Sequence, residues 1–144
     1  MRYIVFALAA ILAGCATVYA PAPGPAQESA PPPAALTENI AIAGLMDGAR
    51  ADAATGRLAN AAASLERALR IEPRNPRLWQ ELARVRLKQG DYAQAESTAA
   101  RSNSWAGSDN ALRAENWRLI AQAREARGDS AGARTALEIA ERQR

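Results

Sequence analysis

An internal repeat restricts the fold of this 144-residue chain more than any other feature of its sequence. The chain superposes on itself after a shift that brings position 45 onto position 79, and again after a slightly longer shift that brings position 79 onto position 117. A bulky residue, a small residue and a glycine recur in this order, at Leu45, Trp79 and Trp117, at Ala49, Ala83 and Ala121, and at Gly56, Gly90 and Gly128. Because each type of residue keeps to its own column, a high alanine content does not explain the pattern. A period of this length indicates stacked copies of one structural unit.

The order of residues within each unit resembles the tetratricopeptide repeat, which is a pair of antiparallel helices. The resemblance covers residues 42–144, with repeats at about 42–75, 76–113 and 114–144. It implies an all-α fold, in which three helical hairpins form a short right-handed solenoid within a domain of residues 37–144. We expect helices at about 38–55, 58–71, 75–89, 92–104, 109–127 and 130–143.

Two columns of small residues have a physical role in such hairpins. Glycine at positions 56, 90 and 128 lets the chain leave the first helix through a left-handed conformation that other residues resist. Alanine at positions 61, 95 and 133 lets the two helices of a hairpin approach closely. Pro73 closes repeat 1 and favours a helix end before it. Trp79 and Trp117 are expected to fill the space between hairpins, whereas both a core role and a binding role stay open for Trp105.

Repeat 2 departs from the family pattern at its end. It lacks the closing proline and is four residues longer than repeat 1. Ser108 is a good residue to cap the next helix, so we expect the insertion to lengthen the fifth helix by a turn. The polar helix that often follows the last tetratricopeptide repeat is missing before Arg144, the last residue. The ends of the solenoid are therefore expected to expose apolar helix faces.

The first fifteen residues resemble a bacterial lipoprotein signal. Arg2 precedes an apolar run that is about half of the ~20 residues a membrane-spanning helix needs. The sequence Leu12-Ala13-Gly14-Cys15 resembles the lipobox, which implies cleavage of residues 1–14 and a lipid on the Cys15 sulfur. Ala16 follows instead of aspartate, which implies the outer membrane, on the side that faces the periplasm. The alternative is an ordinary signal peptide cut after Ala16 or Ala20.

Residues 15–36 connect the lipidated cysteine to the repeat domain and contain six of the eight prolines. Because proline removes backbone donors and fixes φ, we expect a disordered tether without helix or strand. Such a chain samples polyproline II at ~3.1 Å per residue, which gives it an upper reach of roughly 65 Å. A role as a proline-rich ligand for another protein is the alternative.

The composition excludes several classes of function. The chain has no histidine and one cysteine, so a zinc site, a disulfide framework and a Ser-His-Asp triad are impossible within one chain. Glutamates at positions 66, 72, 81 and 96 are available for acid–base chemistry, but nothing in the sequence pairs two of them in an apolar pocket. Acidic residues are interspersed among the arginines, which indicates no nucleic-acid surface. We therefore expect no enzymatic activity, no cofactor and no metal.

The resemblance implies that the first helix of each hairpin lines a concave groove that binds a partner. The candidate contact residues are mostly polar and follow helical spacing: Arg50, Arg77, Gln80, Arg84, Lys88, Arg118 and Gln122, beside Met46, Ala53, Glu115 and Glu125. Arg77, Arg84 and Lys88 share one helix face, so we expect them to bind the carboxylates of an extended peptide segment. The alternative is that they are solvated surface side chains.

The sequence thus predicts an envelope-anchored adaptor or scaffold that binds another envelope or periplasmic protein, for instance in a cell-wall, secretion or pilus assembly. Acyl chains on Cys15 supply the attachment to the membrane. A second hypothesis is a structural lipoprotein that forms a homo-oligomer through the uncapped ends of its solenoid. The molecular mass in solution separates the two hypotheses.

Overall fold

The computed structural model describes the backbone of residues 33–143 and the side chains of residues 39–143. Within this range the chain is all-α, as predicted. Its helices are α1 (Pro33–Ala54), α2 (Leu58–Ile71), α3 (Pro76–Gln89), α4 (Tyr92–Trp105), α5 (Asn110–Ala126) and α6 (Ser130–Arg142). The predicted signal peptide, Cys15 and most of the predicted tether lie outside the described residues. None of the described helices is both long enough and apolar enough to cross a membrane.

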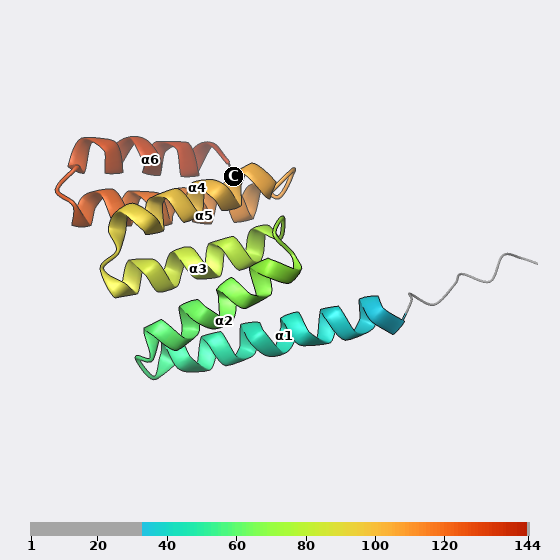
Figure 1. The fold of residues 1–144 in the computed structure, drawn as a ribbon. Coiled ribbons are helices and arrows are strands. Elements are labelled where there is room, and N and C mark those ends of the chain that lie inside the picture. Colours follow the sequence, from blue (N-terminus) through green and yellow to red (C-terminus); the bar gives the residue numbers. More distant parts are fainter. Residues whose placement is uncertain (1–32, 144) are drawn as a thin grey trace, which may run out of the picture. The chain divides into compact units, whose positions relative to one another are not determined.

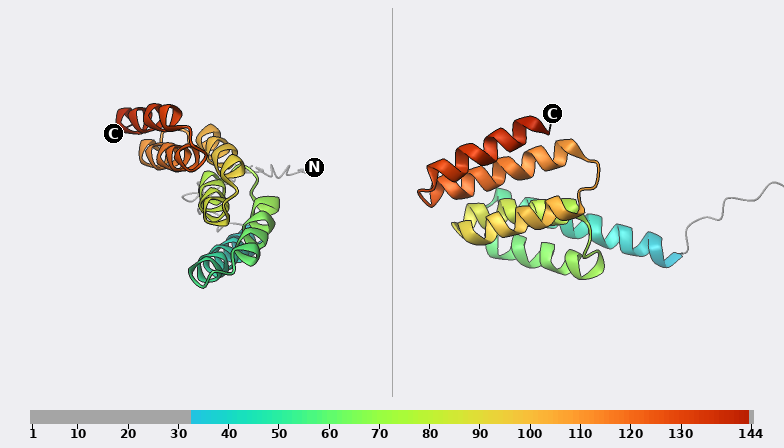
Figure 2. Two further views of the ribbon diagram at one scale, coloured as in Figure 1. Left: turned by 90° about the vertical axis from the view of Figure 1, so that its left-hand side faces the viewer. Right: turned by 90° about the horizontal axis from the view of Figure 1, so that it is seen from above.

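Consecutive helices form three antiparallel hairpins that stack in chain order (Figure 1). α1 packs against α2, α3 against α4 and α5 against α6, and the hairpins meet through α2 with α3 and through α4 with α5. Figure 2 shows the same order from two further directions. Because the helices alternate in direction, α1, α3 and α5 begin at the end of the stack where α2, α4 and α6 finish. We call this the proximal end, and the end with the turns inside each hairpin the distal end.

The predicted helix boundaries agree with the structure to within one residue, except at the start of the first helix. α1 begins at Pro33, five residues before the predicted start at residue 38. The helix therefore includes the last four residues of the segment assigned to the tether. Proline is compatible with the first turn of a helix, because its missing N–H group has no helical partner at that position.

The glycine column reverses the chain at the distal end, as its spacing predicts. Gly56, Gly90 and Gly128 have φ values of 79°, 83° and 83°, in the left-handed region. Gly90 is the C-cap of α3, and its N–H group donates to the Leu87 carbonyl at 3.1 Å. A side chain at these positions would be strained by the backbone conformation alone.

The alanine column occupies the closest contacts between paired helices. Ala61, Ala95 and Ala133 have exposed fractions of 0%, 0% and 4%, which confirms the predicted close approach. Trp79 and Trp117 are partly buried and pack against the apolar cores of the first and last pairs of repeats. Trp105, for which the sequence left two roles open, is 39% exposed and lies at the surface.

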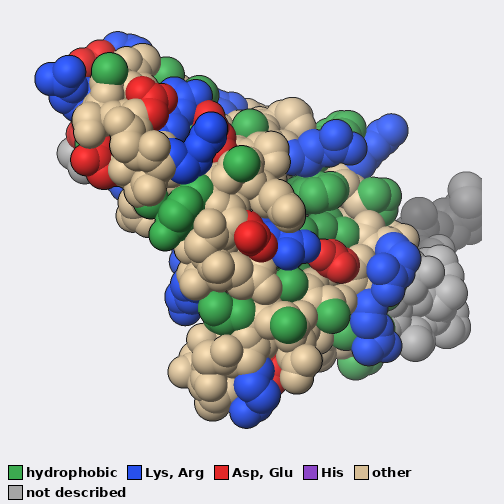
Figure 3. Space-filling model, turned by 60° about the vertical axis from the view of Figure 1, so that its left-hand side comes forward, with side chains coloured by type: hydrophobic (Ala, Val, Ile, Leu, Met, Phe, Trp, Pro, Cys, Tyr) green, Lys and Arg blue, Asp and Glu red, His purple; other side chains and the backbone are tan. Residues whose placement is uncertain are grey.

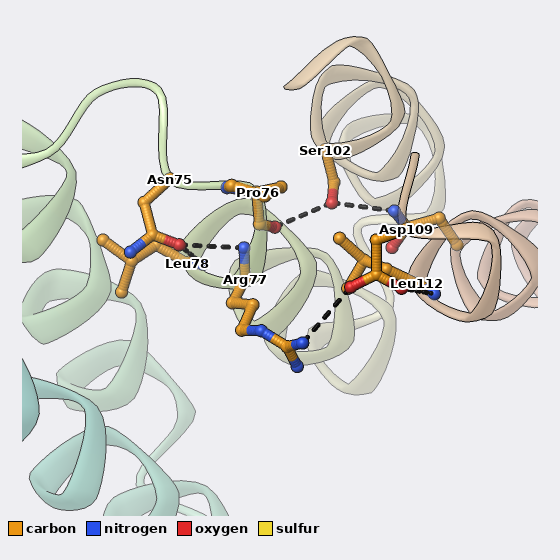
Figure 4. A network of polar contacts seen from close by, with 8 residues as sticks. Asn75, Pro76, Arg77, Leu78, Ser102, Asp109 and Leu112 are labelled. Carbon is orange, nitrogen blue, oxygen red and sulfur yellow. Dashed lines mark hydrogen bonds and ion pairs between the residues drawn. The ribbon is translucent and has the colours of Figure 1, made fainter. Parts of the chain in front are cut away.

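A buried polar network joins repeats 2 and 3 (Figure 4). The Ser102 hydroxyl donates to the Pro76 carbonyl at 2.7 Å, and the Asn116 amide donates to Ser102 Oγ at 2.7 Å. Both side chains are fully buried. Repeat 1 has Ala68 at the position of Ser102, so the corresponding joint between repeats 1 and 2 lacks this hydroxyl. Because burying a polar group is costly unless its hydrogen bonds are kept, the network fixes the start of α3 against α4 and α5.

The N-cap of α5 differs from the prediction. Asp109, and not Ser108, caps the helix, because its carboxylate accepts a hydrogen bond from the Leu112 N–H group at 2.9 Å. Serine and aspartate are equally good N-caps, so propensity does not decide between two such neighbours. α5 has 17 residues and α3 has 14, so the additional turn expected from the insertion is present.

Candidate binding groove

A groove with a volume of about 570 Å³ lies between the first helices of the three hairpins. Side chains of α1, α3 and α5 line it, together with Leu65 of α2. The lining residues are Met46, Ala49, Arg50, Ala53, Ala54, Leu65, Glu81, Arg84, Val85, Leu87, Lys88, Glu115, Arg118, Leu119 and Gln122. A cavity of this volume is large enough to hold several side chains of a bound segment.

The floor of the groove is apolar, and α1 keeps it open. Leu65, Val85 and Leu119 lie on the floor and are at least nine-tenths buried. On α1, Ala49 and Ala53 face the same cavity, and larger side chains there would fill it. α3 packs directly against α5, whereas α1 packs mainly against α2. Space therefore remains between α1 and α3 for an apolar side chain of a partner.

Three arginines at equal sequence spacing, at positions 50, 84 and 118, line the groove and form a ladder of ion pairs along the stack. The pairs are Arg50 with Glu81 at 3.1 Å, Arg84 with Glu115 at 2.7 Å, and Arg118 with Glu141 at 4.0 Å. Every pair joins one hairpin to the next or the two helices of the last hairpin. Exposed pairs contribute at most about 1 kcal/mol each to stability. The main effect of the ladder is therefore to hold the arginine side chains in fixed positions along the groove.

Lys88 is the basic lining residue for which the described part of the chain offers no acidic partner. It is exposed and lies in the last turn of α3. Four basic and two acidic side chains line the groove, which gives it a net positive charge. A carboxylate that enters the groove can pair with Lys88 without displacing a glutamate from an arginine.

Five of the seven predicted contact residues line the groove: Arg50, Arg84, Lys88, Arg118 and Gln122. Arg77 lies outside it, at the start of α3, where it pairs with Asp109 at 3.2 Å (Figure 4). Gln80 is only 5% exposed, so the prediction that it faces a partner is wrong. Its helix face packs inside the stack, which the spacing alone did not reveal. Glu125 also lies outside the groove and accepts a hydrogen bond from the Ser130 hydroxyl at 3.1 Å.

Helical spacing did not predict that Glu81 and the apolar residues of the floor line the groove. One signal in the sequence pointed to Glu81. Glu81 and Glu115 are separated by the same number of residues as Arg50 and Arg84, the arginines with which they pair. Val85, Leu87 and Leu119 gave no comparable signal. An apolar residue on a helix has the same pattern whether it lies in a closed core or on the floor of a groove.

The outer face of α6 is less apolar than the sequence predicts. Leu137 is 48% exposed, but Arg134, Glu138 and Arg142 are also exposed on this helix. The expectation of an apolar face at this end of the stack is therefore wrong for the described residues of α6. Charged side chains do here what a polar capping helix does in other solenoids.

The hairpins, the glycine and alanine columns and the groove together define the class of this protein. It belongs to the tetratricopeptide-repeat family of bacterial proteins, and the family model for the tetratricopeptide repeat matches residues 52–115. A similar solved structure is the globular C-terminal domain of LpoP from P. aeruginosa, with 51% sequence identity and a TM-score of 0.68. The match covers 69% of this chain and 94% of that chain. Comparison with curated proteins found no match.

Membership of this family indicates a domain that mediates interactions between proteins. Stacked repeats of this kind present an extended concave surface, and binding partners use that surface. The fold is typical of interaction modules that are not enzymes.

Proposed function

We propose that this protein is an envelope lipoprotein that acts as an adaptor or scaffold, and that it binds another envelope protein in the groove of its repeat domain. The groove carries this proposal, because it combines an apolar floor with a net positive rim. The ion pairs Arg50–Glu81 and Arg84–Glu115 hold the rim in place before any partner arrives. A preorganised site loses little conformational freedom on binding, so more of the contact energy appears as affinity.

The amino-terminal sequence supports an anchor in the membrane. Cys15 is the only cysteine of the chain, and it follows Leu12-Ala13-Gly14 in the order of a lipobox. Two or three acyl chains, including a palmitate-type chain, hold a protein firmly at a bilayer, whereas a single chain binds reversibly. With Ala16 after the cysteine, we place the protein at the outer membrane, facing the periplasm. The proline-rich residues 16–32, which precede α1, then give the start of the repeat domain an upper reach of roughly 50 Å from that membrane.

The lining of the groove defines the chemistry of the partner segment. The floor near Ala53 and Val85 accepts one apolar side chain, and Lys88 accepts a carboxylate next to it. Arg118 and Gln122 lie on the far side of the same groove and offer further donors. We therefore expect an extended segment of an envelope protein that presents an apolar residue beside acidic residues.

Two groove variants test this function. Ala53→Phe fills the floor, and Lys88→Glu reverses the charge of the unpaired cation. We expect both variants to lose the capture of the partner from envelope extracts, because one blocks the apolar side chain and the other repels the carboxylate. The matched control is Arg134→Glu, which makes the same charge change on α6, outside the groove. Unchanged capture by both groove variants, with circular dichroism showing intact helices, contradicts the proposal.

Self-association is the alternative, and exposed Leu137 on α6 is the feature that favours it. The charged neighbours of Leu137 reduce the apolar area that a second copy can bury. We expect the domain to be monomeric by light scattering over a range of concentrations. A stable dimer that Leu137→Glu dissociates would support the structural alternative instead.

A further inference from the structure

The proximal end carries a surface that the groove does not use. Three of the four exposed large hydrophobic side chains of the described residues lie toward this end: Ile40 is 72% exposed, Ile71 40% and Trp105 39%, whereas the fourth, Leu137, lies on α6 and is 48% exposed. Ile71 and Trp105 are the last residues of α2 and α4, and the positions correspond in repeats 1 and 2. We define the proximal surface as Arg70, Ile71, Arg74, Arg101 and Trp105, which come from α2, the α2–α3 loop and α4.

Contacts between arginines and tryptophans tie this surface together. The Arg74 guanidinium lies 5.2 Å from the centre of the Trp105 ring. The Arg101 guanidinium lies 5.3 Å from the centre of the Trp79 ring, and Trp79 Nε1 donates to the Pro73 carbonyl at 2.8 Å. The cations are therefore held beside aromatic rings, and the two repeats that supply them are linked at this point.

The arginines of the proximal surface have no carboxylate partners among the described residues. Elsewhere in the described chain, eight arginines form ion pairs: Arg50, Arg57, Arg77, Arg84, Arg86, Arg118, Arg124 and Arg127. Arg70, Arg74 and Arg101 form none of these pairs and are exposed. Their positive charge is therefore available to an external anion, and exposed apolar side chains lie beside it.

We propose that the proximal surface binds the anionic surface of a lipid bilayer. Tryptophan and arginine are suited to this boundary, because the indole ring prefers the headgroup region and each cation is attracted by anionic lipids. The position in the fold agrees, since α1 begins at the same end, as Figure 1 shows. A lipid anchor that precedes α1 would therefore be joined to this end of the stack and not to the distal end.

Binding of the proximal surface to a bilayer is weak by itself, but a nearby membrane anchor increases the fraction that is bound. Each basic residue near an anionic surface strengthens binding by about fivefold, so three arginines give on the order of a hundredfold. A flexible connection raises the effective concentration of an attached group to the millimolar range, where such a weak contact is populated. Only this last gain depends on the proposed lipid anchor. The binding itself is tested without it.

The test uses the domain of residues 33–144 without Cys15. The similar LpoP domain forms a globular domain by itself, and the match covers 94% of it, so this domain is expected to fold alone. Flotation measures the fraction bound to vesicles of phosphatidylcholine, with and without phosphatidylglycerol. We expect binding only to the anionic vesicles, with a blue shift of tryptophan fluorescence that Trp105→Ala reduces. We expect Arg74→Glu to lower the partition coefficient on the order of tenfold.

Arg134→Glu is the matched control, because Arg134 is an exposed arginine of α6 and forms none of the ion pairs described above. It should bind anionic vesicles as the wild type does. Arg101→Ala is a second variant, and circular dichroism of each variant separates lost binding from lost folding. No binding of the wild type to anionic vesicles, or an equal loss in Arg74→Glu and Arg134→Glu, overturns the proposal. If Arg74→Glu instead abolishes capture of an envelope protein, the surface binds a protein and not the bilayer. None of these outcomes depends on the groove or on lipidation.

Discussion

The two ends of the repeat stack differ in how their arginines are partnered. Toward the distal end the arginines lie between acids: Arg86 pairs with Glu66 and Asp91, and Glu96 pairs with both Arg124 and Arg127. Figure 3, in which the distal side is turned forward, shows acidic and basic side chains next to one another. At the proximal end Arg77 also pairs with Asp109, but Arg74 and Arg101 lie against tryptophan rings instead. The arginines that pair with Glu66 and Glu96 join one hairpin to the next. Arg74 and Arg101, which lie against tryptophan rings, keep their charge available to an external ligand.

The largest effect is expected at Cys15, the site of the membrane anchor in the proposed function. Cys15→Ser removes the thiol that accepts the lipid, so the protein should lose its palmitate label entirely and remain uncleaved at this site. Metabolic labelling followed by immunoprecipitation measures this. Labelling of the variant at the level of the wild type would mean that the sequence before Cys15 is not a lipobox.

A second change destabilises the packing of the helices that connect the two ends of the stack. Ala95 is fully buried in α4, at the close contact between α3 and α4. Ala95→Leu should overpack this contact and lower the free energy of unfolding by on the order of 1–3 kcal/mol. Thermal unfolding followed by circular dichroism measures the change, and Ala93→Leu at an exposed position of the same helix is the control. Equal melting temperatures for the two variants would show that the helix pairing is not as described.

A smaller effect is expected when distal arginines lose their carboxylate partner, as Arg74 and Arg101 lack one among the described residues at the proximal end. Glu96 accepts from Arg124 Nε at 2.8 Å and lies 3.1 Å from Arg127 Nη1, so Glu96→Gln removes the charge that both arginines share. We expect a loss of about 1 kcal/mol in the free energy of unfolding, since these side chains are partly exposed. Glu138→Gln, at an exposed position of α6, should change it by less than about 0.5 kcal/mol. Urea denaturation compares the two variants. If both have the same midpoint, the distal ion pairs do not hold the hairpins together.

Local rules predicted the parts of the fold that depend on a few neighbouring residues. The turns at Gly56, Gly90 and Gly128 followed from the need for a left-handed residue, and the buried alanine at position 95 followed from its column. The choice between Ser108 and Asp109 as N-cap did not follow, because both residues are suitable and the contact with Arg77 favours the second. The start of α1 at Pro33 did not follow either, because proline is favoured at the first position of a helix but disfavoured inside one.

The site was predicted in outline and not in its electrostatics. Helical spacing correctly put Arg84, Lys88 and Arg118 in the groove, because residues three or four apart share a helix face. It did not show that Arg84 binds Glu115 while Lys88 has no acidic partner among the described residues, since such pairs join residues that are far apart in the sequence. The proximal surface could not be predicted for the same reason, because its contacts also join residues that are far apart in the sequence. Only the structure shows that Arg74 lies over Trp105 and that no described carboxylate neutralises it.

The claim that the groove binds a partner is tested most directly by crosslinking from inside it. Gln122 is exposed and lines the groove, so a photo-crosslinking residue at this position should capture the bound segment in intact cells. The same residue in place of Arg134 reports contacts of the outer face of α6. We predict a crosslink to a specific envelope protein from position 122 that is absent from position 134 and that Ala53→Phe removes. No crosslink from position 122 in a folded and anchored protein, or equal crosslinks from both positions, would contradict the account.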